Sequence, residues 1–93
     1  MSCSFGWNPG KAKENLSKHG VSFLEATTAF ADPLSLTIFD TDHSSAGEDR
    51  YLLLGRSNRG RLLVVVHTEQ GDTIRIVSAR QATRRERNDY EET

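Results

Sequence analysis

The sequence predicts an α+β fold, in which a small antiparallel meander sheet is packed by two N-terminal helices and followed by a C-terminal helix. Two observations predict this class. Helix-capping residues gather near the two ends of the chain, and apolar runs separated by short turns fill the interval between them. Because 93 residues suit one domain, we expect residues 1–93 to form a single domain.

The chain is expected to open with a strand and a helix. Residues 4–7 form a short apolar and aromatic piece that is typical of an edge strand. Asn8 stands before a proline, which indicates an N-cap and a first helical position. The predicted helix covers residues 9–19 and ends at Gly20, a residue suited to a left-handed C-cap.

A second helix is predicted to start at Ser22, because Ser22 and Glu25 have the spacing of a capping box. Its core-facing stripe consists of Phe23, Ala26, Thr27 and Phe30. Asp32 precedes Pro33 and is therefore pushed out of helical geometry, so we expect the helix to end there.

The middle of the chain predicts four strands. Residues 34–39 alternate loosely and indicate a strand, whereas residues 40–49 are polar and acidic and indicate a loop. Three further strands are expected over residues 51–54, 62–67 and 73–79, with turns at Asn58-Arg59-Gly60 and Gln70-Gly71. Because every residue from 62 to 66 is apolar, that strand is expected to be central and covered on both faces.

The register of the last hairpin decides which polar side chains share a face. A two-residue loop at 70–71 places His67, Ser78 and Arg80 on one face of the sheet and Arg75 on the other. A slip of one residue reverses that grouping and places Arg75 with His67. The sequence leaves both registers open.

The C-terminal helix is predicted to start at Thr83, which forms capping-box spacing with Glu86, and to run to about Glu91. It has almost no apolar stripe, since only Ala82 and Tyr90 stand out. A helix that is polar all round is either held by a partner or lies exposed over a site.

Composition and charge exclude several classes of protein. A net charge of −1 excludes a histone-like binder, and the longest apolar run, residues 62–66, is far too short to span a membrane. One cysteine cannot form an internal disulfide, and the first residues lack the pattern of a secretory signal. We therefore expect a soluble cytoplasmic protein.

The charges are unevenly distributed along the chain. Residues 1–49 carry three lysines against seven acidic residues, whereas residues 50–93 carry nine arginines against six acidic residues. Every arginine thus lies in the second half, and arginine grips phosphate bidentately. The imbalance fits contact with nucleic acid and fits a solvated, salt-bridged surface equally well.

Known catalytic motifs are missing from the sequence. His19, His43, His67 and Cys3 have no metal-ligand spacing, and no calcium loop, phosphate loop, dinucleotide fingerprint or serine elbow occurs. We expect no metal and no cofactor. Acid–base chemistry supported by arginine remains.

His67 is the first candidate for that chemistry, because it ends the central apolar strand. On the residues alone, a strand-end histidine bonded to a backbone group is the favoured interpretation. Residues 78–87 contain Arg80, Arg84 and Arg87, which could hold a phosphodiester or pair with neighbouring acids. Tyr90 could stack on a base or anchor the last helix to the sheet.

The chain resembles the BrnT family of bacterial toxins. The resemblance covers FGWNPGKAKENLSKHGVSFLEATTAFADP at 5–33 and RYLLLGRSNRGRLLVVVHTEQGDTIRIVSARQATRRERNDYEE at 50–92. It implies a fold similar to RelE-type ribonucleases, metal-free RNA cleavage that inhibits translation, and neutralisation by a BrnA-type antitoxin in a heterotetramer. It further implies that operator DNA is bound only through the antitoxin.

The resemblance favours functional roles for His67 and Arg80 over purely structural ones. The mechanism we expect is attack of an RNA 2′-hydroxyl on the adjacent phosphate, with His67 moving a proton and Arg80 and Arg75 neutralising the developing charge. The residues expected to bind the flanking RNA are Arg56, Arg59, Arg61, Arg84 and Tyr90.

Two other functions are compatible with the residues. A non-catalytic binding module could dock an acidic partner through its arginine-bearing face. A DNA-binding regulator is the weaker alternative, because it needs a recognition helix and the only arginine-dense helix also carries four acids.

Overall fold

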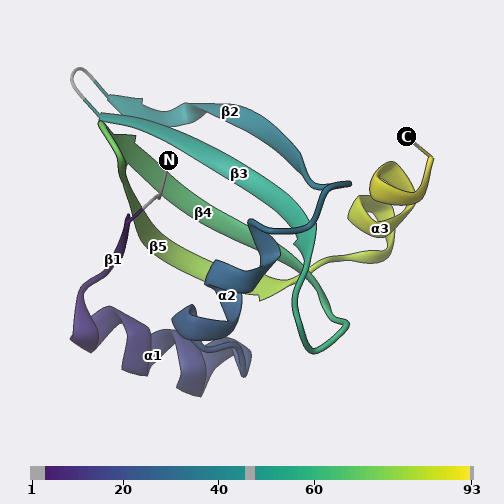
Figure 1. Cartoon of the computed structure of the whole chain (residues 1–93), viewed down its shortest axis with the longest axis horizontal. Helices are drawn as coiled ribbons and strands as arrows, with labels where there is room; N and C mark the ends of the chain where they lie inside the picture. The colour runs from purple at the N-terminus through teal and green to yellow at the C-terminus, as the bar shows by residue number, and fades with distance from the viewer. Residues whose placement is uncertain (1–3, 46–47, 93) are drawn as a thin grey trace.

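The computed structural model of the chain describes residues 4–45 and 48–92. Figure 1 shows the helices and strands that these residues form. In chain order they are β1 (Ser4–Gly6), α1 (Pro9–His19), α2 (Phe23–Ala29), β2 (Leu36–Ser45), β3 (Glu48–Arg56), β4 (Leu62–Gln70), β5 (Thr73–Gln81) and α3 (Arg84–Glu91).

The strands form one sheet in the order β1-β5-β4-β3-β2. Strands β2 to β5 make the predicted antiparallel meander, and the apolar strand β4 is central, as predicted. The short strand β1 pairs with β5 in parallel, so the sheet is mixed rather than purely antiparallel. The structure confirms the α+β class and corrects this detail.

The cap of α1 forms as the sequence predicts. The side chain of Asn8 accepts hydrogen bonds from the backbone N–H groups of Gly10 and Lys11, at 2.8 and 3.1 Å. At the other end Gly20 has a φ of 70°, a left-handed conformation that suits a residue without Cβ. These two caps confirm the predicted helix over residues 9–19.

Helix α2 is shorter than expected. Ser22 accepts a hydrogen bond from the backbone N–H of Glu25, but the Glu25 side chain turns toward Arg61, so only half of the capping box forms. The helix ends at Ala29, before Asp32. The backbone N–H groups of residues 30 to 32 each bond a carbonyl three residues earlier, which tightens the last turn and ends the helix before the proline.

The expected loop over residues 40–49 is wrong, because most of it is a hairpin. Strand β2 pairs with β3 at Asp40 and Arg50, and again at Ser45 and Glu48, with an irregularity between the two pairs. Residues 46–47 lie outside the described residues. The backbone groups of these polar residues are satisfied by pairing between β2 and β3, and a strand at the edge of a sheet needs no continuous apolar face.

The last hairpin follows neither of the two predicted registers. Its turn residues are Gly71 and Asp72, since Gln70 pairs with Thr73 and His67 pairs with Ile76. A bulge then follows, because the next residue of β4, Val66, pairs with Ser78. Gly71 has a φ of 57°, the positive value that tight hairpin turns require.

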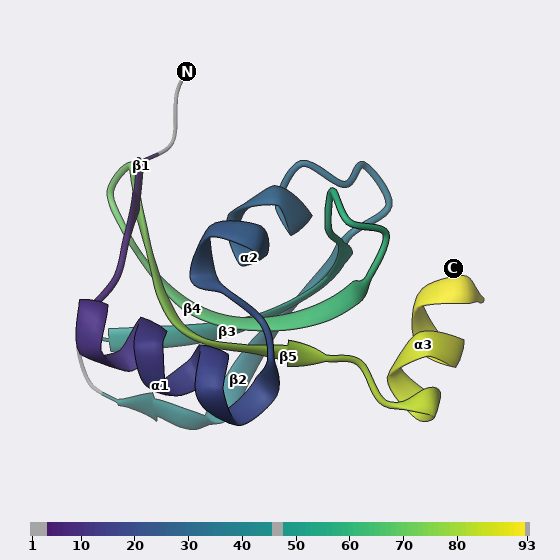
Figure 2. The ribbon, with the colours of Figure 1, turned by 90° about the horizontal axis from the view of Figure 1, so that it is seen from below.

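The three helices occupy different places around the sheet. Figure 2 shows α2 over one face, α1 along the edge formed by β5, and α3 projecting beyond the end of β5. The expectation that both N-terminal helices pack on the sheet holds for α2, whereas α1 packs mainly beside β5. We call the side covered by α2 the α2 face, and the opposite side the open face.

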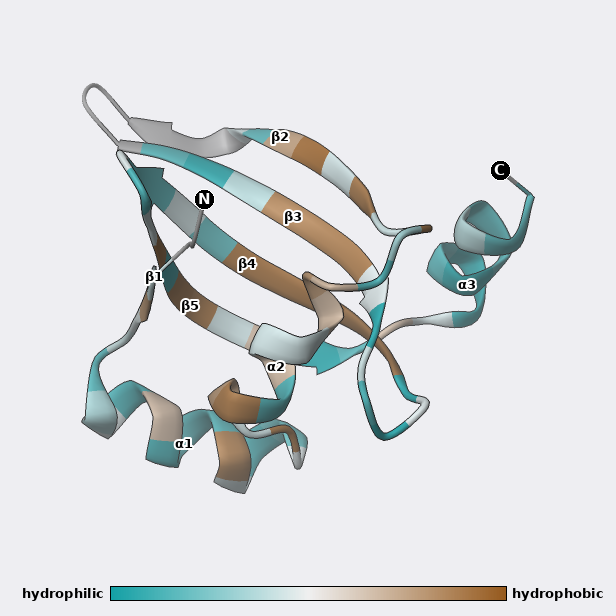
Figure 3. Cartoon of the chain, in the orientation of Figure 1, coloured by the Kyte–Doolittle hydropathy of each residue, from teal (hydrophilic) through white to brown (hydrophobic). Residues whose placement is uncertain are grey.

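Each face has its own apolar cluster. On the α2 face the buried cluster consists of Val21, Phe23, Ala26, Ala29, Leu53, Leu63, Val65, Ile76 and Ala79. On the open face a smaller cluster consists of Leu54, Leu62, Val64 and Tyr90. Figure 3 shows that the apolar stretches of β3 and β4 lie side by side in the sheet, while α3 is mainly hydrophilic. The second cluster covers only the part of the open face that lies near α3.

Candidate functional site

Three arginines share the open face of the sheet. Arg50 and Arg75 both pair with Thr68, so these three residues form one row across β3, β4 and β5. Arg80 pairs with Val64, which places it on the same face two residues along β4 from Val66. Positions 75 and 80 would fall on opposite faces of a regular strand, and the bulge after Ile76 places them on the same face.

A hollow of about 410 Å³ lies between these strands on the open face. Its walls include Asp40, Arg50, Leu52, Val66, Ser78 and Arg80. The lining combines the apolar side chains of Leu52 and Val66 with two guanidinium groups and the one carboxylate of Asp40. Its formal charge is therefore net positive, which suits an anion bound beside an apolar surface. This hollow is the candidate functional site.

Glu86 of α3 fixes the orientation of Arg80. The Arg80 guanidinium donates from Nη1 and Nη2 to the two carboxylate oxygens of Glu86, at 2.8 and 2.9 Å. The same carboxylate accepts the backbone N–H of Thr83 at 2.8 Å and closes the predicted capping box. The bonds to Arg80 lower the pKa of Glu86 to about 2.

Arg80 keeps hydrogen-bonding capacity after this pairing. It donates two bonds to Glu86 and a third, of 3.3 Å, to the carbonyl of Gln81, whereas a guanidinium carries five N–H donors. Its side chain is 40% exposed. Arg80 can therefore receive a phosphate in a fixed orientation.

His67 lies on the α2 face, away from the three arginines. Its side chain is 1% exposed and contacts the rings of Phe30 and Tyr51, with centroids 4.9 and 5.7 Å away. Its Nε2 lies 3.1 Å from a carboxylate oxygen of Glu69. The structure does not bring His67 together with Arg75 or Arg80.

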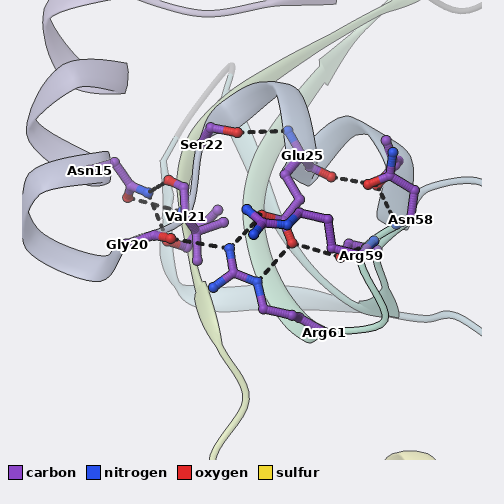
Figure 4. Close-up of polar contacts among 11 residues, drawn as sticks. Asn15, Gly20, Val21, Ser22, Glu25, Asn58, Arg59 and Arg61 are labelled. Atoms are coloured by element: carbon purple, nitrogen blue, oxygen red, sulfur yellow. Dashed lines mark hydrogen bonds and ion pairs between the residues drawn. The ribbon is translucent and has the colours of Figure 1, made fainter.

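Two of the predicted RNA-binding arginines surround a buried carboxylate instead. Glu25 accepts hydrogen bonds from Arg61, both from Nη2 and from Nε at 2.9 Å, and from the hydroxyl of Ser57 at 2.7 Å (Figure 4). The guanidinium of Arg59 lies 3.8 Å from the same carboxylate. The bonds from Arg61 lower the pKa of Glu25.

Arg56 and Tyr90 hold α3 to the sheet. The Tyr90 hydroxyl donates to a carboxylate oxygen of Asp32 at 2.7 Å, and the Arg56 guanidinium lies over the Tyr90 ring at 5.5 Å. The Tyr90 side chain is buried, and its hydrogen bond to Asp32 raises the pKa of its phenol. A base has no access to this ring, which acts as the anchor of α3.

Arg84 is exposed on α3, outside the hollow's lining. Sequence reasoning counted Arg50 in the charge balance but gave it no role, although it lines the hollow. It also missed Glu25 and Asn15, which are buried. The capping spacing drew attention to Glu25 only as a helix residue, and no pattern in the sequence separates Asn15 from an exposed helix residue.

Comparison with known proteins identifies the family. Residues 7–86 match the family described as "Ribonuclease toxin, BrnT, of type II toxin-antitoxin system". The chain belongs to the BrnT family. This confirms the resemblance, and with it a family of ribonuclease toxins that implies an RNA substrate and an antitoxin partner.

The crystal structure of the Brucella abortus ribonuclease toxin BrnT has the same fold as this chain. The TM-score is 0.68 at 19% sequence identity, over 89% of this chain and 100% of the Brucella chain. No curated protein matches the chain. The chain therefore shares its fold and family with BrnT. Roles for the residues of the open face rest on the geometry of this chain.

The described residues contain no cluster of three or more histidine, cysteine, aspartate or glutamate side chains placed to hold a metal ion. None of the helices in residues 4–45 and 48–92 has the length and apolar character of a membrane span.

Proposed function

We propose that this member of the BrnT family cleaves RNA on the open face of its sheet, without a metal ion. The observation that carries the proposal is that Arg50, Arg75 and Arg80 share one face of the sheet, where Arg50 and Arg80 line the hollow. Guanidinium groups suit this task, because they bind phosphate bidentately and stay charged at every physiological pH.

The reaction is an internal transesterification of the RNA chain. The 2′-oxygen of one nucleotide attacks the adjacent phosphorus, the bond from phosphorus to the 5′-oxygen breaks, and a 2′,3′-cyclic phosphate and a 5′-hydroxyl result. The 2′-hydroxyl gives up its proton and the leaving oxygen takes one. Arg80 and Arg75 stabilise the negative charge that develops on the phosphate oxygens.

Proton transfer by His67 stays a prediction that the geometry does not support, because its ring is buried on the α2 face. His67→Phe tests it with little disturbance of the ring contacts to Phe30 and Tyr51. Cleavage by the folded variant at the wild-type rate would remove His67 from the mechanism. A loss of cleavage with RNA affinity unchanged would restore it.

Arg80→Ala is the direct test of the open face. Removing one electrostatic contact to the reacting phosphate should lower the cleavage rate by about 100-fold. Arg87→Ala, on the exposed surface of α3, is the matched control and should cleave like the wild type. Cleavage of purified RNA, with and without ribosomes, is measured beside growth and total RNA after induced expression.

Failure of the wild-type chain to arrest growth or cut RNA would overturn the proposal. The result would favour the alternative of a non-catalytic module that docks an acidic partner through its arginines. An undiminished rate for Arg80→Ala at equal protein levels would instead move the site away from the open face.

The proposal includes the finer features of the family resemblance. The cytoplasmic toxin would have a RelE-type fold and inhibit translation by cutting mRNA. A BrnA-type antitoxin would neutralise it in a heterotetramer and supply the binding of operator DNA. The family match supports an antitoxin partner in general. Adding the purified antitoxin to the cleavage reaction tests this directly. RNA cleavage should fall in proportion to the fraction of toxin that is bound.

A further inference from the structure

Helix α1 is fixed against the edge of β5 by one buried side chain. The amide of Asn15 donates to the carbonyls of Ala79 and Val21, at 2.8 and 2.9 Å, and its carbonyl accepts the backbone N–H of Ala79 at 3.1 Å. Asn15 thus bonds the free edge of the strand as a neighbouring strand would. These bonds set which face of α1 borders the sheet.

Two lysines lie on that face of α1. Lys11 and Lys18 precede and follow Asn15 by four and three residues, which is the spacing of one helix face. Both are exposed, and with His19 they surround a hollow of about 220 Å³. Glu14 supplies one carboxylate to the same hollow, so its charge is net positive.

This α1 hollow adjoins the hollow of the open face. Val77 and Ser78 of β5 line both of them. Strand β1 does not separate them, because it pairs with β5 only at Thr73, Ile74 and Arg75. A basic path therefore runs from the arginines of the open face, over the edge of β5, to the lysines of α1.

We propose that the α1 hollow is a second RNA subsite, in which Lys11 and Lys18 bind phosphates of the strand that flanks the cleaved one. The inference rests on the proposed cleavage of RNA at the open face. Single-stranded RNA fits because it presents one charge per nucleotide along a flexible backbone, and lysines along a groove follow such a backbone without sequence preference. Ser78, at the junction, can donate a hydrogen bond to a passing phosphate.

The lining distinguishes RNA from an apolar protein segment as the occupant. Lys13 lies on another side of α1, where it borders a different hollow together with Trp7, Leu16 and Leu24. That side presents apolar side chains, whereas the α1 hollow is bordered mainly by polar and charged ones. The same helix thus supplies a lysine of equal charge outside the proposed path.

Salt dependence of RNA binding tests the subsite. The probe is a fluorescently labelled single-stranded 2′-O-methyl RNA, which binds without being cut because the attacking hydroxyl is blocked. We expect Lys11→Ala and Lys18→Ala each to weaken binding at low salt and to reduce the slope of log affinity against log salt by about 0.7, the contribution of one phosphate contact on a single strand. Lys13→Ala is the matched control and should bind like the wild type.

The outcomes separate this inference from the proposed function. If the wild type cuts ordinary RNA while all three lysine variants bind alike, the subsite is wrong and the cleavage site stands. If the wild type neither binds nor cuts RNA, the proposed function itself fails. If Lys11→Ala and Lys18→Ala weaken binding of the purified antitoxin and leave RNA binding unchanged, the α1 hollow is a protein interface and the inference is overturned.

Discussion

Arg61 and Arg80 each pair with a glutamate, but the two pairs lie in different surroundings. Arg61 bonds Glu25 under the turn between β3 and β4, where the two side chains are 26% and 5% exposed. Arg80 bonds Glu86 beside the open hollow, where they are 40% and 29% exposed. The first glutamate is enclosed by protein, and the second remains open to solvent on one side.

The difference separates a structural arginine from one available to a ligand. Glu25 also binds Ser57, and Arg61 donates to the carbonyl of Gly20, so this pair joins α2 to the turn before β4 and to the end of α1. Arg80 likewise bonds one glutamate and one carbonyl, that of Gln81, but both partners lie within six residues of it and its side chain lines the hollow. The sequence predicted an RNA contact for both arginines, because the residues next to each of them along the chain do not indicate which one is enclosed by protein.

The strongest test of the comparison is the loss of each carboxylate in turn. Glu25→Gln should lower the free energy of unfolding by about 3 kcal/mol, because it leaves a partly buried guanidinium without its counter-charge. Glu86→Gln should lower it by about 1 kcal/mol or less, since surface pairs contribute little and glutamine can still close a capping box. Urea denaturation of both variants measures this. Equal losses would show that burial does not distinguish the two pairs.

Acid titration sharpens the comparison for the open-face pair. Arg80 lowers the pKa of Glu86 from 4.5 to about 2, so the folded state holds fewer protons than the unfolded state over that range. The stability that this pair contributes is present above about pH 4.5 and is lost as the pH falls toward 2. The free energy of unfolding of Glu86→Gln should therefore fall less steeply over this range than that of the wild type. Parallel curves would contradict the paired carboxylate.

Removal of the Arg59 side chain should have the smallest effect on the free energy of unfolding, because this side chain lies near Glu25 without burying it. Its side chain is 70% exposed, so Arg59→Ala should change the free energy of unfolding by no more than about 0.5 kcal/mol. Arg61→Ala should cost clearly more, because Glu25 would stay buried with its main cation removed. Thermal unfolding of the two variants compares them, and a larger loss for Arg59→Ala would reverse their assigned roles.

Local signals predicted most of the elements. Asn8 and Gly20 bound α1, and Thr83 and Glu86 open α3, because capping depends on residues within one turn of each other. The apolar run at 62–66 identified the central strand for a similar reason. The polar part of β2 around Asp40 was missed because backbone pairing with β3 holds it in the sheet, and such pairing leaves no apolar period in the sequence.

The candidate site could be predicted only in part. The sequence identified Arg75 and Arg80 as a pair of interest, and the structure places both on the open face. It grouped His67 with one or the other, since either regular register requires that. Arg75 faces away from His67 because it pairs with Thr68, the next residue of β4. The bulge after Ile76 adds one residue to β5 and turns Arg80 to the same face as Arg75.

The sequence by itself thus determined the helices, the meander, the family and the concentration of arginine in the second half of the chain. Only the tertiary structure decided which arginines meet carboxylates and which face the solvent. Caps and apolar periods act between residues a few positions apart. The contacts of Arg61 with Glu25, and of Asn15 with Ala79, join residues 36 and 64 positions apart, and these become neighbours only when the sheet assembles.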